Sequence, residues 1–273
     1  MTYINTRNNV GLYVKDWGKG KPVIFIHGWP LSADSWDDIA MPVVNAGFRA
    51  IAYDRRGFGR SDQPWSGYDY DTMADDLADV MAATGATDAT LVGFSMGGGE
   101  VARYMSRHGG QNVSKAVLLS SIVPFMLKTD DNPEGVDAAV FNDILDGIQK
   151  DRANFFAGFF KDFYGVGMVS KPVSEEWLQW SRSVAMQASL KATLDCVKAF
   201  SATDFRGDLA SFKVPTLVIH GTSDKIVPID TSARKAIEGI TNAKLIEYKS
   251  EPHGVFATYK DQLAADLISF LRT

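Results

Sequence analysis

The sequence predicts an α/β fold, in which a mostly parallel sheet of eight strands is flanked by helices on both faces. Three observations lead to this prediction. Short apolar runs alternate with segments of helical period, which is the pattern of repeated β-α units. One such run passes through Gly-x-Ser-x-Gly directly into a helix-compatible stretch, within residues 90–105. An aromatic-rich segment of helical character, residues 122–212, then interrupts the alternation.

Each element can be placed in chain order from its apolar pattern. Two short strands flank residues 7–11 and predict a hairpin. The later strands are short, continuously apolar runs, as expected where both faces of a sheet are covered. The predicted strands are residues 3–6, 12–17, 23–26, 48–53, 91–94, 115–120, 216–220 and 245–248. The predicted helices include residues 36–44, 72–83, 138–148, 175–186 and 259–271.

The interruption at residues 122–212 is predicted to form a helical cap, with residues 1–121 and 213–273 as the core. Eight of the sixteen phenylalanines lie between Phe125 and Phe200, and two more follow before residue 213. We expect most of these rings to form the core of the cap. The others are expected to face a pocket over the carboxyl edge of the sheet, where ligands bind in such folds.

Composition limits the classes of function. The chain has 273 residues, 45% of them apolar, and a formal charge of −5, which argues against a nucleic-acid partner. Its one cysteine, Cys196, excludes an intrachain disulfide and a cysteine-based metal site. The first residues carry no basic region followed by an apolar run, and no apolar stretch is long enough to span a membrane. A cytoplasmic enzyme without metal ligands is therefore expected.

The most informative residue is Ser95, within the Gly-x-Ser-x-Gly pattern of residues 93–97. A strand before this pattern and a helix after it describe a nucleophile elbow, which exposes the serine hydroxyl above the sheet. Gly93 and Gly97 are small because the strand and helix pass close to each other there. The helix also directs unpaired N–H groups and its positive dipole end toward the serine. The pattern predicts a catalytic serine.

A serine nucleophile needs a base, and we assign this role to His253. It lies in a loop between the last strand and the last helix, which places the imidazole over the same sheet edge as Ser95. The other histidines are given structural roles. We assign His27 to the turn after its strand, His108 to a helix C-terminus and His220 to the core as a satisfied residue.

The acid that orients the base is assigned to Asp224, which follows a buried strand and lies between Ser95 and His253 in the chain. In folds built around such an elbow the order is serine, acid, histidine. A turn-capping role for Asp224 is the simpler alternative. Weaker candidates for the acid are Asp130, Asp131, Asp204 and Asp208.

A separate acidic group is better explained as charge at a helix N-terminus than as a metal site: Asp69, Asp71, Asp75 and Asp76.

Acyl transfer also needs N–H donors for the oxyanion. The residue after the nucleophile, Met96, supplies one. The loop after the strand at 23–26 should supply the other, and Trp29 is the natural donor because Pro30 has no N–H. Pro30 restricts the residue before it, so it could also turn the Trp29 carbonyl toward an incoming hydrogen peroxide. The simpler alternative is that Pro30 only stiffens the loop.

With these residues assembled, the whole chain resembles the α/β-hydrolase fold superfamily. Within it, the chain is most similar to the cofactor-free haloperoxidases, also described as aryl esterases and perhydrolases. The motifs that carry the resemblance are Phe-Ile-His-Gly-Trp-Pro-Leu-Ser at 25–32, Tyr-Asp-Arg-Arg-Gly-Phe-Gly-Arg-Ser at 53–61, Gly-Phe-Ser-Met-Gly-Gly-Gly at 93–99, residues 123–130 and Pro-His-Gly at 252–254.

The resemblance implies a Ser-His-Asp triad on Ser95, His253 and Asp224, with oxyanion donors on Trp29 and Met96. It also implies carboxylesterase activity, peracid formation with hydrogen peroxide as co-substrate, and no cofactor. Relatives of this kind are commonly homo-oligomers, often trimers or hexamers. Halide oxidation in this family is attributed to peracid, which agrees with the lack of metal-ligand clusters in the sequence.

We therefore expect a serine hydrolase of small carboxylic esters. Its acyl pocket should be walled by Trp29, Phe125 and Phe159. Lactonases, lactamases and C–C bond hydrolases use the same triad and stay open as alternatives, as does a hydrolase-fold receptor without turnover. Dehalogenases and epoxide hydrolases are disfavoured because their ester intermediate needs an aspartate where Ser95 stands.

Overall fold

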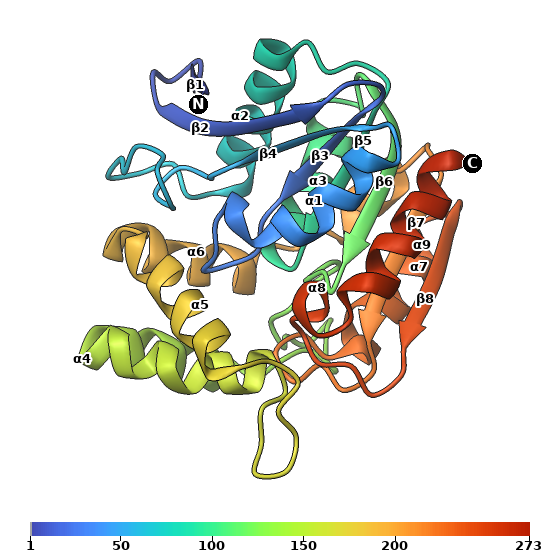
Figure 1. The fold of residues 1–273 in the computed structure, drawn as a ribbon. Coiled ribbons are helices and arrows are strands. Elements are labelled where there is room, and N and C mark those ends of the chain that lie inside the picture. Colours follow the sequence, from blue (N-terminus) through green and yellow to red (C-terminus); the bar gives the residue numbers. More distant parts are fainter. Residues whose placement is uncertain (1) are drawn as a thin grey trace.

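A computed structural model describes residues 2–273 and contains one sheet of eight strands (Figure 1). The order of strands across the sheet is β1-β2-β4-β3-β5-β6-β7-β8. Their bounds are β1 Thr2–Asn5, β2 Gly11–Gly18, β3 Pro22–Ile26, β4 Arg49–Tyr53, β5 Ala89–Phe94, β6 Val113–Leu119, β7 Thr216–Gly221 and β8 Ala243–Tyr248. The predicted eight-stranded sheet is therefore confirmed, with strand ends that differ by one or two residues.

The pairing follows the burial of the strands. The hairpin β1–β2 and the pair β2–β4 are antiparallel, and every pairing from β4 through β8 is parallel. The central strands β3, β5 and β7 are buried along their whole length, because helices cover both faces of the sheet.

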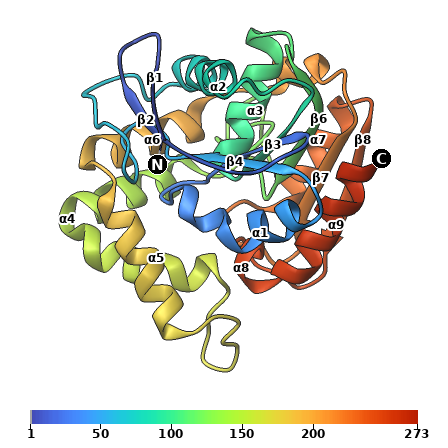
Figure 2. The same ribbon diagram turned by 45° about the horizontal axis from the view of Figure 1, so that its top comes forward.

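The helices outside the interruption form two layers (Figure 2). Helices α2, α3 and α7 lie on one face, and α1, α8 and α9 lie on the other. Their bounds are α1 Asp37–Asn45, α2 Tyr70–Thr84, α3 Met96–Arg107, α7 Ala233–Gly239, α8 Val255–Thr258 and α9 Lys260–Arg272. None of the helices described between residues 2 and 273 has the length and apolar character needed to cross a bilayer.

Between β6 and β7 the chain forms α4 (Ala138–Phe163), α5 (Glu175–Gln187) and α6 (Leu190–Ala202). These helices lie together at one end of the sheet (Figure 1). The predicted helix at 138–148 continues to Phe163, with a break at Asp151, whose φ of −161° is not helical. The Asp151 carboxylate accepts a hydrogen bond from the Asn154 N–H at 3.0 Å, so it caps the second half of α4.

Short 3-10 turns complete the fold, at Ala33–Trp36, Arg206–Ser211 and Ile229–Thr231.

The acidic group near α2 has more than one role, which corrects the prediction of helix-terminal charge alone. Asp69 caps α2 through the Thr72 N–H at 2.9 Å. Asp76 instead forms a buried ion pair with Arg56 at 2.6 Å. Asp71 and Asp75 bind side chains of α3 and its C-terminus.

Candidate active site

Ser95 lies between the end of β5 and the start of α3, at a sharp turn. Its φ of 53° and ψ of −118° are strained for a residue with a side chain. The turn is held by the Ser95 N–H, which donates to the Leu119 carbonyl at 2.8 Å. The following helix begins at Met96, so its unpaired N–H groups surround the serine. This geometry is that of the predicted elbow.

Two glycines allow the strand and helix to approach each other at the elbow. A Cβ on Gly93 would lie 2.5 Å from the Gly97 carbonyl oxygen. A Cβ on Gly97 would lie 2.5 Å from the carbonyl oxygen of Ile26 on β3. Both contacts are with backbone atoms, so no side-chain movement could relieve them. The elbow therefore requires glycine at both positions.

The structure brings Ser95, His253 and Asp224 together from three separate loops. The His253 Nε2 atom lies 3.0 Å from the Ser95 hydroxyl oxygen. The His253 Nδ1 atom lies 2.7 Å from Asp224 Oδ2. Because the carboxylate can only accept, Nδ1 carries the proton and Nε2 is left as an acceptor for the serine hydroxyl. The three residues form a continuous hydrogen-bonded chain.

The second oxygen of the Asp224 carboxylate is also hydrogen-bonded. Its Oδ1 accepts the N–H groups of Ile226 at 2.9 Å and Val227 at 2.8 Å. Burial alone would raise the pKa of Asp224, but the imidazoles of His253 and His220 hold this pKa well below its usual range. Asp224 is therefore an anion fixed in position, and its carboxylate both caps the turn and binds His253.

The weaker acid candidates are engaged elsewhere. Arg206 binds the carboxylates of Asp131, at 2.7 Å, and of Asp204, at 2.6 Å. Arg103 approaches Asp208 at 3.3 Å, and Asp130 is exposed. None of these four carboxylates is hydrogen-bonded to His253.

His220 differs from the satisfied core residue that the sequence predicted. It is fully buried, and its Nε2 atom lies 2.8 Å from the Val227 carbonyl oxygen. The same nitrogen lies 3.1 Å from Asp224 Oδ2, and Nδ1 has no hydrogen-bond partner within residues 2–273. The prediction of a fully hydrogen-bonded core histidine was wrong, because it considered only the strand that carries His220. The turn after β7 brings the Asp224 carboxylate next to the His220 ring.

Two N–H groups near Ser95 are free to bind an oxyanion. The N–H of Met96 is at the first position of α3, and that of Trp29 is in the loop after β3. Within residues 2–273 neither N–H donates to a protein acceptor. Trp29 is fixed at its other end, because its indole N–H donates to the Thr193 carbonyl at 3.1 Å.

A buried polar network supports the loop that carries Trp29. The His27 Nδ1–H donates to the Gly28 carbonyl at 2.9 Å, and His27 Nε2 accepts the Arg55 N–H at 3.0 Å. Burial and the Arg55 charge lower the pKa of His27 well below its ordinary value, so it stays neutral. The Arg55 guanidinium also donates to the His27 carbonyl at 2.7 Å and forms a buried ion pair with Glu100 of α3. The turn role predicted for His27 agrees with these contacts.

Ser95 opens onto a small apolar cavity of about 50 Å³. Trp29 and Phe159 line it, as predicted, and Phe159 packs edge-on against the Trp29 ring at 5.3 Å. The remaining lining residues, which the sequence did not single out, are Ile122, Met126, Val136, Val140, Phe141, Ile144, Phe200, Ile226 and Val227.

Phe125 does not line this cavity, contrary to the prediction. The Arg206 guanidinium lies over its ring, 5.3 Å from the centroid, and the next residue, Met126, faces the cavity instead. Of these two neighbouring side chains only Met126 lines the cavity, so the assignment of Phe125 to the acyl pocket was wrong.

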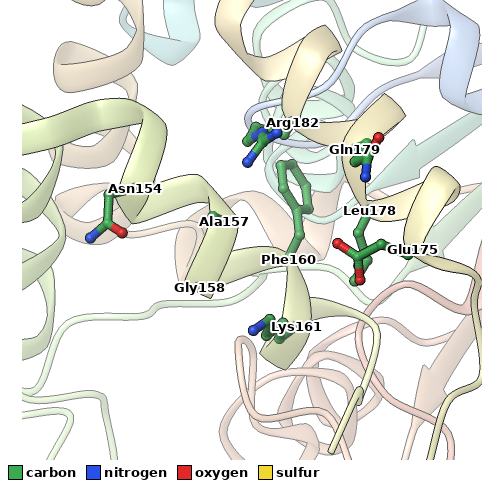
Figure 3. Close-up of a pocket in the computed structure, with 9 residues that line it drawn as sticks. All are labelled: Asn154, Ala157, Gly158, Phe160, Lys161, Glu175, Leu178, Gln179 and Arg182. Carbon is green, nitrogen blue, oxygen red and sulfur yellow. The ribbon is translucent and has the colours of Figure 1, made fainter.

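A larger cavity of about 330 Å³ lies between α4 and α5 (Figure 3). Polar and charged side chains border it, among them Lys161, Glu175 and Arg182. None of the residues assigned to the site lines this cavity. Within residues 2–273 there is no cluster of three or more histidine, cysteine or carboxylate side chains suited to a metal ion.

Comparison with known proteins identifies the fold family of the chain. A family model described as the α/β hydrolase fold matches residues 21–258. The chain is 42% identical to a non-heme haloperoxidase of Rhodococcus erythropolis over the whole of both chains. It is 43% identical to a bifunctional esterase/perhydrolase of Acinetobacter calcoaceticus, again over the whole of both. The crystal structure of a bromoperoxidase from Bacillus anthracis superposes with a TM-score of 0.97 and 43% identity, covering 100% of this chain and 99% of that one.

Proposed function

The chain belongs to the α/β hydrolase fold family, and on that premise we propose that it is a serine hydrolase of small carboxylic esters. The observation that carries the proposal is the hydrogen-bonded chain of Ser95, His253 and Asp224, which opens on an apolar cavity. Relatives named as haloperoxidases and as an esterase/perhydrolase support a hydrolase of this kind.

In the proposed mechanism the Ser95 oxygen attacks the acyl carbon while His253 Nε2 takes the hydroxyl proton. Asp224 keeps the imidazole oriented and stabilises the imidazolium. The N–H groups of Trp29 and Met96 bind the oxyanion, and each such donor is typically worth about 10²–10³ in rate. His253 then protonates the leaving alcohol, and water, activated by the same imidazole, releases the acid from the acyl-enzyme.

The cavity defines the class of acyl group. Its volume of about 50 Å³ and its aliphatic and aromatic lining suit a short, uncharged acyl chain. A charged acyl group would lose its hydration there without gaining a partner. We propose that residues 122–212 act as a cap, because Phe141, Phe159 and Phe200 of this segment close the cavity above Ser95.

Perhydrolysis is the proposed side activity. Hydrogen peroxide would replace water in attacking the acyl-enzyme, so that one of its oxygens bonds to the acyl carbon while His253 Nε2 takes the proton from that oxygen. Ser95 leaves with a proton from His253, and a peracid is released. Apparent haloperoxidase activity would then come from oxidation of halide by the peracid. The esterase/perhydrolase relative supports this combination of activities.

The test is a rate survey with covalent labelling. Purified protein is treated with a fluorophosphonate, and rates are measured on esters, lactones and amides of graded acyl length and on a C–C bond hydrolase substrate. We expect labelling of Ser95 and fastest turnover of short-chain esters. Fastest turnover of a lactone, an amide or a C–C bond substrate would replace the ester assignment. A protein that neither labels nor turns over any substrate would be a non-catalytic member of the fold.

A further inference from the structure

The triad carboxylate has a second imidazole neighbour that the mechanism above does not use. His220, at the end of β7, directs Nε2 at Asp224 Oδ2 from 3.1 Å, while His253 Nδ1 binds the same oxygen at 2.7 Å. Both histidines are fully buried. One carboxylate oxygen therefore lies between two ring nitrogens, one from β7 and one from the loop after β8.

The contacts of His220 determine where its proton lies. Nε2 is also 2.8 Å from the carbonyl oxygen of Val227, which can only accept. Nε2 must therefore carry the hydrogen and donate it to both Val227 and Asp224. Nδ1 of this buried ring has no partner within residues 2–273. Toward Asp224, His220 is therefore a hydrogen-bond donor through Nε2.

We propose that His220 is a positioning residue of the triad, which fixes the Asp224 carboxylate and limits how strongly that carboxylate attracts the proton of His253. This inference rests on the proposed function. The His220 N–H stabilises the Asp224 anion independently of His253. Without it, more of the negative charge on Oδ2 is available to the imidazolium form of His253. Loss of His220 therefore makes His253 a more basic group.

The other groups around this pair leave the direction of the effect unchanged. Asp224 Oδ1 is held by the backbone N–H groups of Ile226 and Val227, which do not titrate. On β8, Glu247 is the register partner of His220, and its carboxylate binds Arg234 at 2.8 Å. Glu247 is therefore already neutralised by a cation, and the titration that changes is that of His253.

The experiment compares His220→Phe with His220→Gln. Phenylalanine fills the space without a donor, while glutamine can present an N–H from a similar distance. The rate of fluorophosphonate labelling of Ser95 and kcat/KM on an activated ester are measured between pH 5 and 9. For His220→Phe we expect the acid limb to move up by about one pH unit, a tenfold change in the protonation equilibrium of the base. We also expect kcat to fall by about tenfold with an unchanged KM.

The glutamine variant should restore both the acid limb and kcat toward the wild-type values. A matched control is His108→Phe, because His108 binds Asp75 at the end of α3, away from the triad. A folded His220→Phe variant whose acid limb matches the wild type would overturn the proposal, even if its kcat were lower. An acid limb that moves equally in the His108 control would do the same.

A measurement on the wild-type protein keeps the proposal testable if both His220 variants fail to fold. Nitrogen-15 spectra of the labelled histidines should show that the ring hydrogen of His220 lies on Nε2. A His220 that carries its hydrogen on Nδ1 and not on Nε2 overturns the proposal. Failure of the proposed function would look different, since the wild-type protein would then neither label at Ser95 nor hydrolyse esters.

Discussion

Shortening Phe159 should widen the acyl pocket and change the preferred chain length. Its ring lines the cavity above Ser95 and contacts Trp29, and it is only half-buried. In Phe159→Ala, two further methylenes of an acyl chain can occupy the space that the ring leaves. At about 0.8 kcal/mol for each buried methylene, they contribute about 1.6 kcal/mol, or roughly 15-fold in kcat/KM. The loss of stability should stay below the roughly 3–5 kcal/mol typical of fully buried phenylalanines.

The assay is kcat/KM on p-nitrophenyl butyrate and hexanoate, with the ratio of the two as the readout. Phe125→Ala is the matched control. It makes the same chemical change at a ring that lies under Arg206 and does not line the cavity. We expect the hexanoate-to-butyrate ratio to rise only in Phe159→Ala. If a folded Phe159→Ala variant keeps the wild-type ratio, or if Phe125→Ala shifts it equally, the cavity is not the acyl site.

Other outcomes concern the triad and its loops. Ser95→Ala should lower kcat on an aryl ester by about 10⁴–10⁶ and His253→Ala by nearly as much, since the members act as a unit; a His253 variant that keeps about a tenth of normal turnover would show that another group is the base. Asp224→Asn should cost about 10⁴ in kcat, and a larger loss in Asp130→Asn would place the acid on the helical segment. Because the pKa of Asp224 is lowered in the folded state, its contribution to the free energy of unfolding is present above about pH 4 and is lost as the pH falls through the folded-state pKa. Acid-unfolding curves of the wild type and Asp224→Asn should therefore converge at low pH, and curves that stay parallel would contradict this. Pro30→Leu should lower the ratio of perhydrolysis to hydrolysis if the Trp29 carbonyl receives peroxide, whereas equal changes in both would leave only loop stiffening.

The sheet could be predicted because its strands are buried on both faces and so read as short, continuous apolar runs. Helix ends were less predictable, as α4 shows. The apolar pattern placed the end of this helix at Ile148, while the structure continues to Phe163 through the break at Asp151. Asp151 ends one helical segment and caps the next, so the prediction stopped short of the break and missed the segment beyond it.

The proximity of Ser95, Asp224 and His253 could be predicted for a related reason. Ser95, Asp224 and His253 each follow the end of a parallel strand, and such ends meet at one edge of the sheet. Their position in the chain is thus enough to place them together. No such rule exists for the lining of the cavity, because the lining depends on which side chains of the loop after β6 face Ser95. The choice of Phe125 in place of Met126 is an error of one residue, and it reverses the direction of the side chain.

Supporting residues are the hardest to predict, because their role depends on a contact rather than on a position. Arg55 and Glu100 are 45 residues apart, and only the packing of α3 against the β4 turn makes them a buried pair behind the Trp29 loop. His220 is a different case, since it lies four residues before Asp224 across a tight turn. A histidine at the end of a strand is close enough to contact the carboxylate of an aspartate in the turn that follows. That spacing is a local signal for a contact between His220 and the Asp224 carboxylate, and the Val227 carbonyl is the second partner of the same ring nitrogen.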